Sequence, residues 1–91
     1  MNTTYDEILL TGVRLWRENM QAPSVRGVAA ALNLTHPAVL YYCKNAAGLR
    51  KALADQAVKM GDMTLIPLLI VTNDPSVAHF TDEQRRAYLP S

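Results

Sequence analysis

The sequence predicts an all-α protein of five or six short helices. Several apolar stretches are preceded by a Ser, Thr or Asn, the residue types that cap helix N-termini. Within these stretches the apolar residues recur three or four positions apart, and no segment shows the two-residue alternation of a half-buried strand. A chain of 91 residues with 49% hydrophobic and 19% charged residues corresponds to one small globular domain.

The first predicted helix covers residues 5–19. Thr4 and Glu7 have the spacing of a capping box, in which the two side chains satisfy each other's backbone N–H groups. Trp16, in the second half of this helix, is the largest apolar side chain of the segment and is expected to anchor the core.

Two short helices are predicted next. Ser24 should cap a helix over residues 25–32, which Asn33 ends because asparagine tolerates the left-handed conformation. Thr35 should cap a helix over residues 36–43, with Pro37 in its first turn, where the missing N–H costs nothing. Two helices of this length joined by a short turn have the spacing of a helix-turn-helix.

Three further helices complete the prediction. One follows Asn45 and stops at Gly61. One covers residues 65–71 after a Thr64 cap, and Asn73-Asp74-Pro75 then forms a turn. The last begins with a capping box at residues 81–84.

The segment from Ser24 to Leu53 resembles the DNA-binding domain of tetracycline-repressor (TetR) family regulators. The resemblance lies in SVRGVA at 24–29, THPAVLYYC at 35–43, and a polar pair followed by Leu49. It extends over about residues 8–53, half of the chain. It implies a homeodomain-like, TetR-N-like helix-turn-helix bundle in which residues 36–43 form the recognition helix.

Four departures from the family pattern bear on function. Leu40 stands where the family has Tyr, Cys43 where it has Phe, and Ala46 where it often has a phosphate-contacting Lys. The family's large ligand-binding and dimerisation domain has no counterpart in the residues after the fourth helix. We therefore expect residues 1–60 to form the DNA-binding domain and 61–91 a helical extension, without a small-molecule ligand.

The residues expected to contact DNA lie on the second and third helices and just after them. The family resemblance gives Arg26 a guanine or phosphate contact, and the first turn of the third helix should read base edges. The tyrosines and Lys44 should contact phosphates, with Tyr42 preferred over Tyr41. Each of these side chains could instead be solvated surface or core. The full set is Ser24, Arg26, Thr35, His36, Pro37, Ala38, Tyr41, Tyr42 and Lys44.

Charge is distributed unevenly along the chain, although the net charge is only +1. Residues 8–54 contain six basic residues and one acidic residue, whereas the two ends together contain three basic and seven acidic residues. A cationic middle segment suits a nucleic-acid ligand. Chance scatter in a short chain is the alternative.

The segment 65–71 is apolar on all sides, so a helix there must be covered all round. We expect one face to pack on the domain and the other to form a twofold homodimer contact. The alternative is a monomer in which the last helix folds back over this surface. The residues expected in the dimer contact are Met63, Leu65, Ile66, Leu68, Leu69 and Ile70.

Several classes of function are disfavoured. The sequence has one cysteine, Cys43, no cluster of Cys and His, no phosphate-binding glycine loop and no recognisable catalytic pair. We expect no enzyme activity, metal or cofactor, and we interpret Cys43 as a core residue. The N-terminus does not resemble a signal peptide, and the longest apolar run is too short to cross a bilayer, so we expect a cytoplasmic protein with no membrane partner.

These observations predict a sequence-specific regulator of transcription, a repressor of the kind that phages or mobile elements encode, which binds double-stranded DNA as a homodimer. The alternatives are a helix-turn-helix protein-interaction module, such as an antirepressor or assembly adaptor, and a DNA-packaging or excision factor. The low net charge and Ala46 favour the alternatives, whereas Arg26 and Lys44 favour DNA binding.

Overall fold

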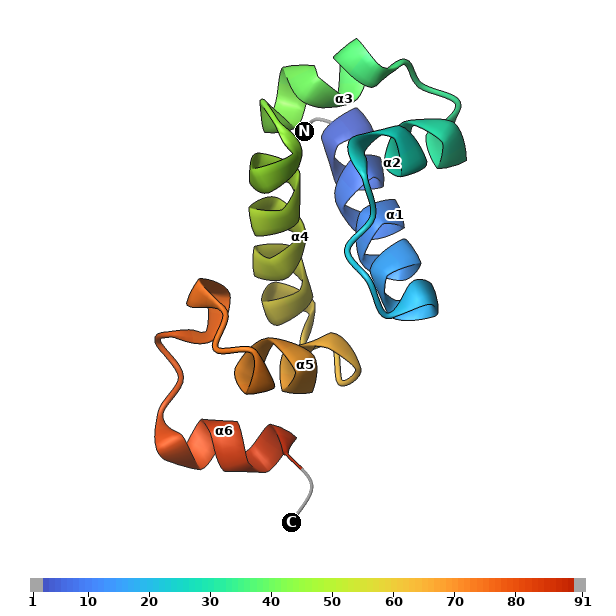
Figure 1. Ribbon diagram of the computed structural model, residues 1–91. Coiled ribbons are helices and arrows are strands. Elements are labelled where there is room, and N and C mark those ends of the chain that lie inside the picture. Colours follow the sequence, from blue (N-terminus) through green and yellow to red (C-terminus); the bar gives the residue numbers. More distant parts are fainter. Residues whose placement is uncertain (1–2, 90–91) are drawn as a thin grey trace.

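Helices make up most of residues 3–89, the part of the chain that the computed structural model describes (Figure 1). No strand occurs in that part, so the all-α prediction is confirmed. The elements in order are α1 (Thr3–Asn19), α2 (Val25–Leu32), α3 (His36–Cys43), α4 (Ala46–Met60), α5 (Leu65–Val71), a 3₁₀ turn η1 (Pro75–Val77) and α6 (Asp82–Tyr88).

The helices are arranged along α4, which gives the molecule an elongated shape of 42 × 23 × 22 Å. α1 packs beside α4, and α2 and α3 lie at the end where α4 begins (Figure 1). α5 and α6 lie at the opposite end, and η1 returns to pack against α4. The predicted helix-turn-helix is therefore separated from the C-terminal extension by the length of α4.

Most helix N-termini are capped by the side chains that the sequence indicates. In each case a side-chain oxygen accepts the backbone N–H three residues further on, which satisfies a donor that the helix leaves free. The pairs are Ser24 with Gly27 at 2.9 Å, Thr35 with Ala38 at 3.2 Å, Asn45 with Gly48 at 2.7 Å and Thr81 with Gln84 at 3.1 Å. The predicted capping box of the last helix is complete, because Gln84 Oε1 accepts the Thr81 N–H at 2.8 Å.

Two predicted caps are wrong. Thr4 lies inside α1, which begins at Thr3, and therefore does not cap it. The Thr64 side chain makes no capping hydrogen bond. The carboxylate of Asp62 takes its place and accepts the N–H groups of Thr64 and Leu65, both at 2.9 Å. A carboxylate is the stronger acceptor and also suits the positive end of the helix dipole.

One continuous hydrophobic core runs through the described residues. Trp16, only 3% exposed, is part of it as expected, together with Val28 and Val39 from the helix-turn-helix. The C-terminal extension contributes to the same core through α5 and through Val77.

The burial of α5 corrects the predicted dimer contact. Leu65, Ile66, Leu69 and Ile70 are buried within the chain, so in this conformation they cannot contact a second copy. The reason is that α4, η1 and α6 all pack against α5 and cover its apolar faces from different sides. Of the other two predicted residues, Leu68 is half-buried against the core and Met63 is 66% exposed.

The turn between α3 and α4 is unusually tight. Lys44 has φ 65° and ψ −53°, and the Asn45 N–H donates to the Cys43 carbonyl at 2.7 Å across it, which is the geometry of a strained γ-turn. The turn brings the Cys43 carbonyl against α4, where a Cβ on Gly48 would lie 2.1 Å from that oxygen. Glycine at position 48 is therefore required by this close approach.

We predict that Gly48→Ala destabilises the protein by about 2 kcal/mol or more, because the added methyl group meets a backbone atom that cannot turn aside. The methyl group would ordinarily favour a helix, so the steric conflict has to outweigh a gain of about 1 kcal/mol. The free energy of unfolding in urea measures the difference.

Gly27→Ala is the matched control. Gly27 occupies the same position in α2 as Gly48 in α4, and its N–H is also capped. An added Cβ there meets only the Ser24 hydroxyl, at 3.2 Å. Equal effects of the two substitutions on unfolding would contradict the steric account.

Candidate nucleic-acid interface

Buried apolar residues hold α2 and α3 together, while the outer side of α3 stays exposed to solvent. α2 packs against both α1 and α3, and Val28 and Val39 are fully buried between them. Asn33 ends α2 in the left-handed conformation (φ 55°, ψ 41°), as predicted. The Leu34 N–H then donates to the Ala29 carbonyl at 2.8 Å and closes the turn.

Most residues predicted to contact DNA are accessible. Ala38 and Tyr42 are half-buried. The remaining seven are exposed: Ser24, Arg26, Thr35, His36, Pro37, Tyr41 and Lys44. Thr35, His36 and Pro37 are exposed at the N-terminal end of α3.

Four of the predicted residues line a single surface groove of about 440 Å³. They are Ser24, Arg26, His36 and Lys44, which come from the start of α2, the start of α3 and the α3–α4 turn. The other lining residues were not among the predicted DNA contacts; they are Val25, Leu40, Asn45 and Ala46. Leu40 was noted as a departure from the family pattern, and here its side chain forms part of the groove wall.

The two tyrosines of α3 have different environments. The Tyr42 ring stacks on Tyr5 of α1, with centroids 5.8 Å apart and an angle of 24° between the planes. Tyr41 meets Tyr42 edge-on at 5.1 Å and is 82% exposed. Tyr42 is thus held by intramolecular stacking, and Tyr41 is the more exposed of the two tyrosines, although Tyr42 was the preferred DNA contact.

The cationic middle segment is largely neutralised in the folded chain. Four of its six basic side chains form ion pairs with carboxylates. Two pairs are exposed and join residues four apart on one helix, and two connect distant parts of the chain. The pairs are Arg14–Glu18 at 3.2 Å, Lys51–Asp55 at 2.9 Å, Arg17–Asp62 at 2.6 Å and Arg50–Asp74 at 2.6 Å.

The other two basic residues of this segment, Arg26 and Lys44, form no ion pair within residues 3–89. Both are exposed and both line the groove beside α3. The uncompensated positive charge of the segment is therefore concentrated at the helix-turn-helix end of the molecule, a localisation that the sequence alone does not reveal.

The long-range ion pairs were missed by the sequence analysis, since they join residues 24 and 45 positions apart. Both aspartates are buried, and each also caps the backbone of a helical turn. Arg50 lies over the Trp16 ring as well, with its guanidinium carbon 5.1 Å from the ring centroid. These contacts fasten the C-terminal extension to α1 and α4.

The pKa values of Asp62 and Asp74 are lowered. Burial alone would raise each pKa, but hydrogen bonds from nearby N–H and O–H groups and the charge of the paired arginine together outweigh it. The donors to Asp62 include the Leu65 and Thr64 N–H groups. The donors to Asp74 include the Ser76 hydroxyl and N–H groups. Both carboxylates are thus charged at neutral pH.

The described residues contain no group of three or more His, Cys, Asp or Glu side chains that could hold a metal ion. Cys43 is a buried core residue, and burial raises the pKa of its thiol, which disfavours the reactive thiolate. Among the helices of residues 3–89, none is long and apolar enough to cross a membrane.

Comparisons with models of known protein families, with curated proteins and with solved structures found no match. Any assignment of function therefore rests on the sequence, geometry and chemistry of this chain.

We predict that Asp74→Asn lowers the free energy of unfolding by about 2 kcal/mol at pH 6, because the buried Asp74 carboxylate loses its ion pair with Arg50. The lowered pKa gives the wild-type carboxylate a stabilising effect that is fully present above its ordinary value of 3.8. This stabilisation disappears as the pH falls through the lower folded pKa. The difference between wild type and variant should therefore shrink between pH 6 and pH 2, measured by urea unfolding.

Glu18→Gln is the matched control, because it removes a carboxylate from an exposed ion pair. Its effect should stay below about 0.5 kcal/mol. A difference between wild type and Asp74→Asn that is constant across this pH range would show that Asp74 contributes no pH-dependent stability.

Proposed function

We propose that this chain binds double-stranded DNA by placing the N-terminal half of α3 in the major groove. The observation that carries the proposal is the convergence of Arg26 and Lys44, the two unpaired cations of the basic segment, on one groove beside His36. Side chains of this kind bind the phosphates that provide most of the affinity for DNA.

The shape of this end of the molecule suits the ligand. A helix with its side chains is about 10–12 Å across, close to the width of about 12 Å of the major groove. His36 and Pro37 are exposed in the first turn of α3, where a recognition helix contacts base edges. Tyr41, also exposed, lies one turn further on and can donate its hydroxyl to a phosphate.

The proposed role is that of a transcriptional regulator, a repressor that binds a palindromic site as a homodimer. The resemblance of residues 24–53 to TetR-family DNA-binding domains supports it. Most apolar side chains of α5 are buried. A second copy could therefore contact the exposed apolar side chains at the α5 end of the molecule, which are Met60, Met63 and Val71.

We predict that Lys44→Ala and Arg26→Ala each reduce the salt dependence of DNA binding. Affinity for a duplex library should fall steeply between 50 and 200 mM salt, and each substitution should reduce the slope of log K against log salt by about 0.9 per subunit, the value for one lost phosphate contact. Fluorescence anisotropy with labelled duplexes measures both slopes.

Arg14→Ala is the control, since Arg14 is equally basic but is paired with Glu18 on α1. It should leave the slope unchanged. If the wild-type protein binds no duplex at 50 mM salt, DNA binding is excluded and the protein-interaction module becomes the better interpretation, with Tyr41 as its exposed aromatic contact. Equal slopes for Arg14→Ala and Lys44→Ala would also contradict the proposed interface.

A further inference from the structure

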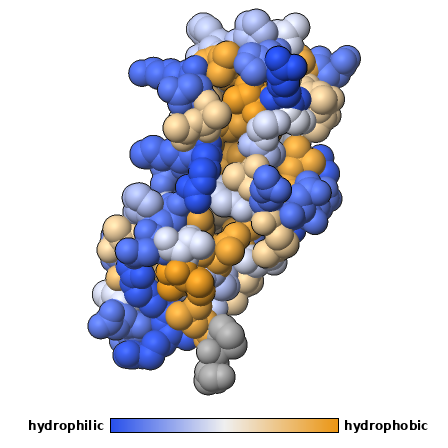
Figure 2. Space-filling view, in the orientation of Figure 1, coloured by the Kyte–Doolittle hydropathy of each residue, from blue (hydrophilic) through white to orange (hydrophobic). Residues whose placement is uncertain are grey.

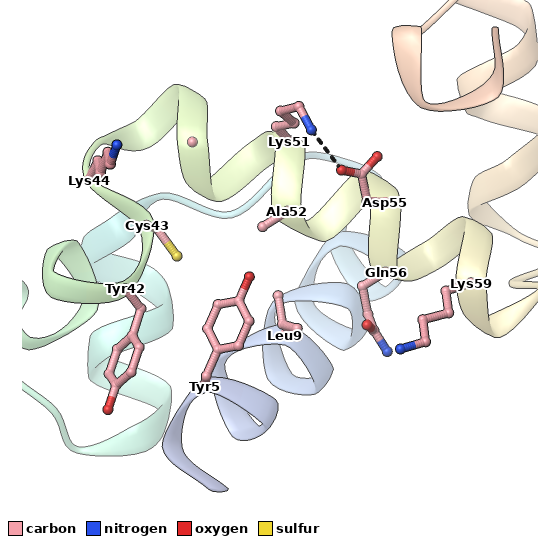
Figure 3. Close-up of a pocket in the computed structure, with 11 residues that line it drawn as sticks. Tyr5, Leu9, Tyr42, Cys43, Lys44, Lys51, Ala52, Asp55, Gln56 and Lys59 are labelled. Atoms are coloured by element: carbon pink, nitrogen blue, oxygen red, sulfur yellow. Dashed lines mark hydrogen bonds and ion pairs between the residues drawn. The ribbon is translucent and has the colours of Figure 1, made fainter. Parts of the chain in front are cut away.

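A second groove, between α1 and α4, has the features of a site for a small anionic ligand. Its volume is about 370 Å³, within the range of ligand pockets in proteins. It begins at the α3–α4 turn and continues along α4 from Gly48 to Lys59, with Tyr5 and Leu9 of α1 on the opposite side (Figure 3). Lys59 is not among the residues that line the DNA-facing groove.

The charge of this groove is positive. Lys44, Lys51 and Lys59 line it, and Asp55 is its one carboxylate among the described residues. Lys51 pairs with Asp55 at 2.9 Å, and the resulting hydrogen bond raises the Lys51 pKa. Lys44 and Lys59 form no ion pair within residues 3–89, so an ammonium group is left for a ligand at each end of the groove.

Two aromatic side chains, Tyr5 and Tyr42, line the groove between these two lysines. Tyr5 lies in the centre of the groove, between Tyr42 and Leu9 (Figure 3). Its stacking on Tyr42 holds the ring in a fixed orientation, while Tyr5 itself stays only half-buried. The small Ala52 and Gly48 opposite leave room for a flat ring.

We propose that this groove binds a nucleoside monophosphate. The base lies against the Tyr5 ring, an arrangement in which stacking is favourable for any base because every base has a π-face. The phosphate is neutralised by the Lys59 ammonium group at one end of the groove. Lys44 lies at the opposite end of α4 and is too far away to contact the same phosphate (Figure 3). The Gln56 side chain, which also lines the groove, supplies a neutral donor and acceptor beside Lys59.

Adenosine 5′-monophosphate, titrated into ¹⁵N-labelled full-length protein and followed by amide chemical shifts, tests the proposal. Saturable shifts should appear at Tyr5, Leu9, Ala52 and Gln56 with a Kd below about 1 mM. Adenosine and inorganic phosphate, titrated separately, should each bind more weakly, because each provides only one of the two contacts. If adenosine bound as tightly as the nucleotide, Lys59 would contribute nothing to the affinity. If inorganic phosphate bound as tightly, the Tyr5 ring would contribute nothing.

Substitutions separate the site from the rest of the fold. Lys59→Ala should raise the Kd about threefold, the effect of one exposed charge pair, and should leave DNA affinity unchanged. Tyr5→Leu should raise the Kd about tenfold through loss of stacking, with circular dichroism as the check on folding. Arg86→Ala, on the exposed surface of α6, is the control and should have no effect.

The absence of shifts at 5 mM nucleotide would overturn the proposal. So would shifts confined to the groove lined by Arg26 and His36, since these would mean that the nucleotide occupies the DNA-facing surface. The proposal would also be overturned if neither Lys59→Ala nor Tyr5→Leu changed the Kd of the nucleotide. None of these outcomes depends on whether the chain binds DNA, because no DNA is present.

Discussion

Two buried aspartates, each paired with an arginine, determine how the two ends of this chain fit together. Asp62 accepts hydrogen bonds from the backbone at the start of α5 and from Arg17 of α1. Asp74 accepts hydrogen bonds from the Ser76 N–H of η1 and from Arg50 of α4. Each carboxylate thus caps the start of one element and connects it through an arginine to another helix. With these links in place, α5 lies over the end of the core, and Leu65, Ile66, Leu69 and Ile70 are buried while Val71 stays exposed. Figure 2 shows apolar surface at this end of the molecule, next to polar residues of the tail.

The same pairs influence the end of the molecule that is proposed to bind DNA. Arg17 and Arg50 belong to a segment that is strongly basic in sequence, and both are neutralised by acidic residues from the tail. The positive charge left in this segment, on Arg26 and Lys44, lies at the helix-turn-helix. The C-terminal extension therefore has an electrostatic effect as well as a structural one, because it neutralises two of the four paired cations of this segment, Arg17 and Arg50.

Local signals were sufficient to predict most of the fold. The caps at Ser24, Thr35, Asn45 and Thr81 were identified correctly because a cap is a contact between residues three apart. Two caps were predicted wrongly from local signals, at Thr4 and at Thr64, where Asp62 accepts the N–H groups instead. The other errors concern contacts between distant segments, which local spacing does not show. For the same reason α5 was expected to offer a dimer face, although η1 and α6 cover it, and Tyr42 was preferred over Tyr41, although it stacks on Tyr5. Four of the nine residues predicted to contact DNA do line one groove, since they lie at the starts of two adjacent helices and on the turn that follows.

The central claim is that DNA meets this protein at the α2–α3 end and nowhere else. Binding of a duplex selected from a random library, mapped by amide chemical shifts, tests it most directly. The account predicts shifts at the start of α2, along α3 and at the α3–α4 turn, with α5 and α6 unchanged. Shifts centred on α5 and α6, or the failure of any duplex to be enriched, would contradict it.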